Sequence, residues 1–187
     1  MKSEKEQRTD GPEFSATPWN TPTLWQAANA SLSAAIQENL PAMVELYRIA
    51  GSIRKALASL FPVMDDLCRS TCPSCKDICC LRSWVWADFK DLLFFHLAGI
   101  DVPERQLLWR RGDHCHYSGT DGCRLDRLQR PFVCTWYICP AQTERLDHMP
   151  VHAKFILKTL DEVKWMRRKL EDDFILAVSG SNLKTDD

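Results

Sequence analysis

The sequence has no apolar run approaching the roughly 20 residues that a membrane-spanning helix needs. Its first residues, MKSEKEQRTDGPEFS, are polar and charged, and they lack the apolar segment of a secretory signal peptide. Acidic and basic residues nearly balance, and the net charge of −1 gives no indication of nucleic-acid binding or of an anionic membrane partner. We therefore expect a cytoplasmic protein that binds neither membrane nor nucleic acid.

Several kinds of active site are also missing. We find no phosphate-binding loop, no nucleophile elbow and no pair of carboxylates placed for acid–base catalysis. The acidic residues at 161–162 and 171–173 are best interpreted as the solvated face of a helix. Catalytic residues, if the protein has any, are therefore unknown from the sequence.

Strand signals are weak throughout, whereas apolar residues recur at helical spacing. The stretches with this spacing are 24–36, 43–61, about 84–97, and 151 to about 178. Pro41 marks a break, Pro62 predicts the end of the second stretch, and Gly99 suits the C-terminal cap of the third. Asp101-Val-Pro-Glu104 has the form of a capping box, which predicts a short helix through Trp109.

We predict a mainly α fold in which helices clasp an irregular, cysteine-rich, metal-binding middle. Residues 1–22 read as a disordered tail, because they contain too few apolar side chains to offset the entropy of ordering. Residues 23–178 form a single helical metal-binding domain with its cysteine cluster at 68–140. Residues 179–187 form a polar tail, and glycines and prolines make residues 112–148 irregular.

Cysteine is absent from both flanks, and all nine cysteines lie between residues 68 and 139. Seven of them form two groups: Cys72, Cys75, Cys79 and Cys80 in the first, and Cys115, Cys123 and Cys134 in the second. A disulfide framework is an alternative, but the number of cysteines is odd and export signals are missing. In a reducing compartment, clustered cysteines are more often metal ligands or redox groups.

A Cys-x-x-Cys loop presents two sulfurs to one metal and serves both zinc and iron–sulfur sites. We expect Cys72, Cys75, Cys79 and Cys134 to be ligands first, and Cys80, Cys115 and Cys123 next. Neighbouring side chains rarely reach the same ion, so Cys80 either serves a second metal or only packs. Seven thiols exceed the four of one tetrahedral site, which leaves two metals, or one cluster with unligated thiols, as alternatives.

Other side chains accompany the cysteines. Arginines near the second group would offset thiolate charge, or would form an ordinary solvated face; they are Arg110, Arg111, Arg124, Arg127 and Arg130. Tryptophans near the cysteines either shield a metal site or fill the core; they are Trp84, Trp86, Trp109 and Trp136. His114 and His116 could ligate zinc or be solvated, and His96 on an apolar helix face is interpreted as a satisfied core residue. The roles of Cys68 and Cys139 stay open.

The combined pattern resembles the YkgJ-type cysteine-cluster family, which is described as a zinc- or iron-chelating domain. The CxxCxxxCC motif matches residues 72–80, Cys115 and Cys123 match the paired cysteines of the second motif, and Arg130, Pro131 and Cys134 match the closing signature. The resemblance covers about residues 68–140. Leu128 replaces a tyrosine that is usual in the family, and the flanking helices carry no resemblance.

A similar cysteine cluster occurs in flagellin lysine-N-methylases, described as iron–sulfur proteins that use S-adenosylmethionine, but those chains are much longer. Cys68, Cys72 and Cys75 also reproduce the CxxxCxxC spacing of radical S-adenosylmethionine enzymes, without the aromatic residue and the barrel that accompany it.

We therefore expect a metal-binding cysteine-cluster protein. The surplus of thiols, the scarcity of histidine and the methylase resemblance favour an iron–sulfur cluster over zinc, and zinc is the alternative. A second hypothesis is an iron–sulfur redox or S-adenosylmethionine-dependent enzyme that modifies another protein. A third is a metal chaperone or adaptor whose long C-terminal helix docks on an unknown client protein.

Overall fold

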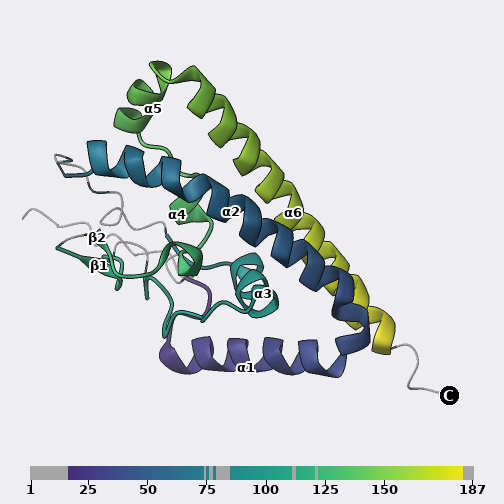
Figure 1. Cartoon of the computed structure of the whole chain (residues 1–187). Coiled ribbons are helices and arrows are strands. Elements are labelled where there is room, and N and C mark those ends of the chain that lie inside the picture. Colours follow the sequence, from purple (N-terminus) through teal and green to yellow (C-terminus); the bar gives the residue numbers. More distant parts are fainter. Residues whose placement is uncertain are drawn as a thin grey trace, which may run out of the picture.

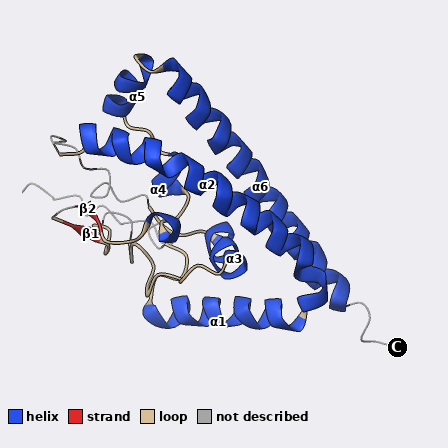
Figure 2. Ribbon diagram, viewed as in Figure 1, coloured by secondary structure: helices blue, strands red, loops and turns tan. Residues whose placement is uncertain are grey.

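The computed structural model is mainly helical, with one small antiparallel strand pair (Figures 1 and 2). It describes residues 17–73, 75, 78, 85–110, 113–120 and 122–182. The helices are α1 (Pro22–Glu38), α2 (Val44–Thr71), α3 (Phe89–Ala98), α4 (Val133–Trp136), α5 (Pro140–Asp147) and α6 (Pro150–Asn182). The described residues also include the 3-10 helices η1 (Leu40–Met43) and η3 (Arg127–Gln129) and the strands β1 (Ser118–Gly119) and β2 (Gly122–Cys123).

The two longest helices, α2 and α6, run antiparallel and pack along one another, and α3 lies in the angle that they make with α1 (Figure 1). The apolar stripes of these four helices face inward and form the main core, which includes Trp25, Ile53, Phe95 and Leu170. A smaller core lies where α5 and the start of α6 cover the end of α2. The long amphipathic patterns of the sequence therefore become the frame of the molecule.

The ends of α1 and α3 follow from local sequence. Thr21 caps α1 by accepting a hydrogen bond from the backbone N–H of Leu24 (3.2 Å), and Pro22 occupies the first turn. Helix α3 begins at Phe89, several residues later than predicted, because Asp88 and Asp91 form a reciprocal capping box there. It ends at Gly99, whose φ of 62° suits glycine, as predicted.

Helix α2 does not end at Pro62, which corrects the sequence-based boundary. It continues to Thr71, so that Cys68 lies on the helix. Because Pro62 has no N–H, the carbonyl group four residues earlier in the helix lacks its usual hydrogen-bond donor. Pro62 is exposed, so water can bind that carbonyl group instead. The apolar stripe meanwhile continues inward through Met64 and Leu67, and their burial stabilises the last turns.

The predicted short helix through Trp109 is also wrong. This segment has irregular backbone, and the buried side chain of Gln106 binds two other backbone segments as well as its own. The side-chain oxygen Oε1 of Gln106 accepts from the N–H groups of Ala87 (2.7 Å) and Leu107 (3.0 Å), and its side-chain nitrogen Nε2 donates to the carbonyls of Pro18 and Ala87 (both 3.0 Å). The local capping pattern is overridden by these tertiary hydrogen bonds.

Residues 112–148 are more regular than predicted, because they include the strand pair, η3, α4 and all of α5. Ordered packing also begins ahead of residue 22, since buried Thr17 donates to the carbonyl of Leu108 (2.8 Å). At the other end α6 continues past residue 178, to Asn182. Residues 1–16 and 183–187 of the predicted tails lie outside the described residues.

A buried ion pair joins α3 to α6. The guanidinium of Arg167 contacts the carboxylate of Asp91 at 2.7 Å and that of Asp88 at 3.0 Å. The side chains of Asp91 and Arg167 are only 3% and 5% exposed. Asp91 also accepts a hydrogen bond from the backbone N–H of Phe132 at 2.9 Å, so the segment that leads into α4 belongs to the same network.

None of the helices in the described part of the chain is long and apolar enough to cross a membrane.

Replacing Gln106 by Leu should lower the free energy of unfolding by about 2–4 kcal/mol, because buried backbone groups in three segments would lose their partner. Gln129→Leu is the matched control, since Gln129 bonds the carbonyl of Asp101 (3.2 Å) from a more exposed position and should cost no more than about 1 kcal/mol. Chemical denaturation followed by circular dichroism measures both. Equal losses for the two variants would contradict the assignment of Gln106 as a clamp.

Candidate metal centre

The three cysteines of the second group come from three different places and converge. Cys115 lies in the loop before β1, Cys123 is in β2, and Cys134 is in α4. Cys115 is 7% exposed and packs with Leu107 and Leu108, and Cys134 packs against the same cluster. A negative charge on Cys115 or on Cys123 would raise the pKa of Cys134. The three sulfurs therefore lie within electrostatic range of one another.

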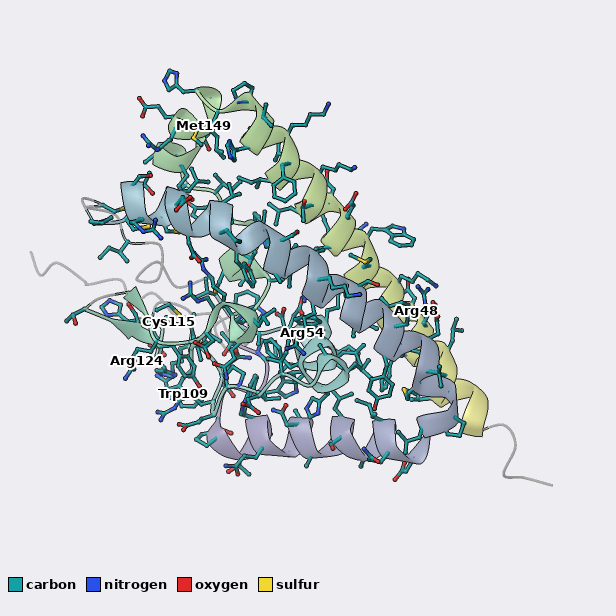
Figure 3. The ribbon with its side chains drawn as sticks, in the orientation of Figure 1. Arg48, Arg54, Trp109, Cys115, Arg124 and Met149 are labelled. Atoms are coloured by element: carbon teal, nitrogen blue, oxygen red, sulfur yellow. The ribbon has the colours of Figure 1, made fainter. Side chains whose placement is uncertain are left out.

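The strand pair brings Cys123 back toward Cys115. Ser118 pairs with Cys123 in the antiparallel register, and Ser118 also donates its N–H to the carbonyl of Cys115 (3.0 Å). Gly122 has a φ of 111°, a conformation that favours glycine and lets the chain reverse here. The guanidinium of Arg124 bonds the carbonyl of His116 and closes the turn. In Figure 3, Cys115, Arg124 and Trp109 lie together at this end of the molecule, far from Arg48.

Burial dominates the electrostatics of this group. It raises the pKa of the Cys115 and Cys134 thiols above the usual value, and the neighbouring cysteines raise both pKa values further. Arg124 acts in the opposite direction on Cys115, and Arg130 does so on Cys134, but both effects are smaller. Without a bound cation, these two thiols are therefore neutral at pH 7, although arginines lie nearby.

The first cysteine group begins where α2 ends. Cys72 follows the last helical residue and is exposed, and the N–H of Cys75 donates to its carbonyl (3.1 Å). Cys79 and Cys80 lie outside the described residues. Within the described ranges, no three His, Cys, Asp or Glu side chains are placed closely enough to hold a metal ion. Cys115, Cys123 and Cys134 therefore lie within electrostatic range of one another, but as placed here they are not close enough to hold a metal ion together.

Cys68 and Cys139 have a different environment, which the sequence did not reveal. The sulfur of Cys68 accepts hydrogen bonds from Arg127 Nη2 and from Gln142 Nε2, both at 3.5 Å. Buried Gln142 also accepts from the N–H of Cys139 (3.3 Å) and so links the end of α2 to the start of α5. In the sequence, the spacing of Cys139, Pro140 and Gln142 is typical of the start of a helix, and this signal could have indicated the structural role of Cys139.

The arginines of this region mostly bind backbone or acidic groups. Arg127 bonds Asp65 on α2 as well as Cys68, and Arg130 Nε donates to the carbonyl of buried Leu125 (3.0 Å). The backbone N–H of Arg110, rather than its guanidinium, donates to the Asp113 carboxylate (2.8 Å). Arg111 lies outside the described residues. Arg130 therefore holds the loop that precedes Pro131 in place.

The histidines differ from one another. His114 is exposed, whereas His116 is half-buried, with Nδ1 3.1 Å from the carbonyl oxygen of Gln106 and its ring 4.5 Å from that of Trp109. His96 is half-buried and bonds Asn29 (3.0 Å), in agreement with its interpretation as a satisfied residue. Nothing among these contacts assigns a histidine to the cysteine group.

The tryptophans that flank the cysteines do not form one shield. Trp86 and Trp109 are half-buried, Trp136 is 49% exposed, and Trp84 lies outside the described residues. Trp136 contacts Tyr137 edge-on rather than covering a cysteine (6.3 Å between ring centroids). Core filling therefore accounts for the half-buried Trp86 and Trp109 but not for the exposed Trp136.

In metal-free protein, Cys72 should react with a maleimide at least about tenfold faster than Cys115, because Cys72 is exposed whereas burial protects the Cys115 thiol and raises its pKa. Timed labelling followed by peptide mass spectrometry measures both rates in one sample, so that each cysteine is the control for the other. Equal rates under native conditions would contradict the burial of Cys115.

Of the seven predicted ligands, the structure describes Cys72, Cys75, Cys115, Cys123 and Cys134, and it places the last three within electrostatic range of one another without forming a metal-binding group among the described residues. No protein-family model, no curated protein and no solved structure matches the chain.

Proposed function

We propose that this protein binds a metal through its cysteines, as an iron–sulfur cluster or as zinc. Cys115, Cys123 and Cys134 supply one part of the ligand set. The segment with Cys72, Cys75, Cys79 and Cys80 supplies the rest. The observation that carries the proposal is the convergence of three thiols from a loop, a strand and a helix.

The chemistry of the converged thiols supports a cation. Negative charge on Cys123 raises the pKa values of Cys115 and Cys134, so a cation beside these sulfurs would favour their ionised form. A zinc ion or an iron–sulfur centre supplies that positive charge and binds thiolates directly.

The contacts of Arg127 support a contribution from the first group. Arg127 lies between Cys123 and Cys134 in the chain, and it bonds both Asp65 and Cys68 on the last turns of α2. Cys72 follows one turn after Cys68. The end of α2, from which the CxxCxxxCC segment continues, is therefore joined to the loop that carries the second group.

The donor set suits sulfur-binding metals. A cluster would supply electron transfer at this place, whereas zinc would stabilise the fold around the two groups. The resemblance to the YkgJ-type family agrees with either metal. No contact within the described ranges favours the enzyme or chaperone alternatives, so the proposal is limited to metal binding.

Cys134→Ser should reduce the metal content of anaerobically purified protein by at least about tenfold, because removal of a thiolate opens the coordination shell. Cys68→Ser is the matched control and should keep its metal, since Arg127 and Gln142 already occupy its sulfur. Elemental analysis for iron, zinc and sulfide, together with an absorption spectrum, measures both variants. The proposal fails if wild-type protein carries no metal, or if both variants carry as much as wild type.

Metal affinity should rise with pH. The pKa values of Cys115 and Cys134 are raised, so both thiols are protonated at neutral pH and must release a proton when they bind. Each released proton lowers the Kd about tenfold per pH unit, which predicts about 100-fold tighter zinc binding at pH 7.5 than at pH 6.5. Competition with a chromophoric chelator, corrected for the chelator's own protonation, measures the change. A Kd that does not depend on pH would contradict binding through these thiols.

A further inference from the structure

Helix α4, which carries Cys134, cannot hold its own position. It has only four residues, and a helix of that length is not stable by itself in water. Its own hydrogen bonds are local, such as those from Cys134 N to the Pro131 carbonyl and from Thr135 N to the Phe132 carbonyl (both 2.9 Å). Contacts with the rest of the protein must therefore decide where the Cys134 sulfur lies.

Two charged side chains from other helices supply these contacts. Oδ1 of Asp91 accepts the backbone N–H of Phe132, two residues before Cys134, and the same oxygen is 2.7 Å from Nη1 of Arg167. The guanidinium of Arg167 also lies over the Phe132 ring, 4.9 Å from its centroid. The backbone and the side chain of Phe132 are thus held by two residues that bind each other.

The orientation of the Asp91 carboxylate is itself fixed. Its second oxygen accepts the N–H of Asp88 (2.9 Å) in the capping box of α3, and Arg167 Nη2 reaches Asp88 (3.0 Å). Both oxygens of Asp91 and both terminal nitrogens of Arg167 are therefore in use. A buried ion pair is a poor way to gain stability, because apolar side chains of the same size often do as well. The pair instead fixes the relative positions of the groups that it contacts, and here these groups include the backbone and the ring of Phe132.

We propose that Asp91 and Arg167 are positioning residues for Cys134, which hold the start of α4 so that the sulfur meets the metal together with Cys115 and Cys123. The consequence for metal rests on the proposed function. The positioning itself concerns the protein alone and can be measured without metal.

The first experiment labels metal-free protein with a maleimide and follows each cysteine by peptide mass spectrometry. Cys134 is half-buried, so loosening α4 should expose its sulfur further and raise its rate. We expect Asp91→Asn to raise the Cys134 rate about tenfold and the Cys115 rate less than about threefold. Leu170→Ala is the control, because it removes a fully buried core side chain of α6 but leaves the ion pair and the hydrogen bond that hold Phe132 in place. It should lower the melting temperature similarly without favouring Cys134 over Cys115.

Phe132→Leu separates positioning from a direct effect of charge. Asp91 is among the charges that raise the pKa of Cys134, after burial and the two cysteines, so its removal could by itself speed labelling. Phe132→Leu keeps both charges of the ion pair but removes the ring that the Arg167 guanidinium contacts. Loss of positioning speeds labelling in both variants, whereas a pure charge effect speeds it in Asp91→Asn alone. The latter result, or equal acceleration in Leu170→Ala, would overturn the proposal.

The second experiment adds cobalt(II), whose visible absorption reports the number and geometry of thiolate ligands. Asp91→Asn and Arg167→Met should weaken cobalt binding about tenfold and change the spectrum, and Arg167→Lys should restore part of both, because lysine keeps the charge but not the fork. Arg167→Lys also serves if Asp91→Asn does not fold. If wild-type protein binds no cobalt, the proposed function fails and labelling still decides the positioning. If wild type binds cobalt and the variants bind it equally well, with an unchanged spectrum, only the positioning proposal fails.

Discussion

The ion pair between Asp91 and Arg167 is the constraint on which the arrangement of the helices depends. Removing two charges from water costs several kcal/mol for each ion, and this pair offsets that cost because both oxygens of Asp91 and both terminal nitrogens of Arg167 have partners. Burial is the main cause that raises the pKa of Asp91 to about 6, and Arg167 opposes the shift. At pH 7 the carboxylate is thus still charged, and α3, α6 and the start of α4 are joined through one point.

The second constraint is the length of α2. Because the helix continues past Pro62, its last turns extend beyond the main core and carry Cys68 to Arg127 and Gln142. Arg127 belongs to η3, which precedes Cys134 in the chain, and Gln142 belongs to α5, which follows it. The helical frame and the cysteine-bearing middle are thus connected at both sides of α4. Metal binding at this place would join segments that the frame already holds near one another.

The cysteines themselves divide into two kinds. Cys115 and Cys134 are held in an apolar environment that keeps their thiols neutral, whereas the sulfur of Cys68 accepts hydrogen bonds from polar side chains. A thiol that already accepts two hydrogen bonds gains less from a bound metal ion, whereas a thiol close to other thiols gains more. This difference in surroundings separates the cysteines that we assign to a metal from one that stabilises the fold.

The amino-acid sequence by itself determined the mainly helical class, the long stripes of α2 and α6, and the cap of α3 at Gly99, because periodic apolar residues and glycine caps act through neighbours in the chain. Only the tertiary structure decided that Pro62 lies within a helix, that Gln106 is a clamp rather than part of a helix, and that Asp91 meets Arg167 and Phe132. The grouping of the second cysteines was predicted from spacing, but their burial and the separate surroundings of Cys68 were not. Each of these features depends on partners far apart in the chain, and local spacing carries no information about which distant group will satisfy a buried polar atom.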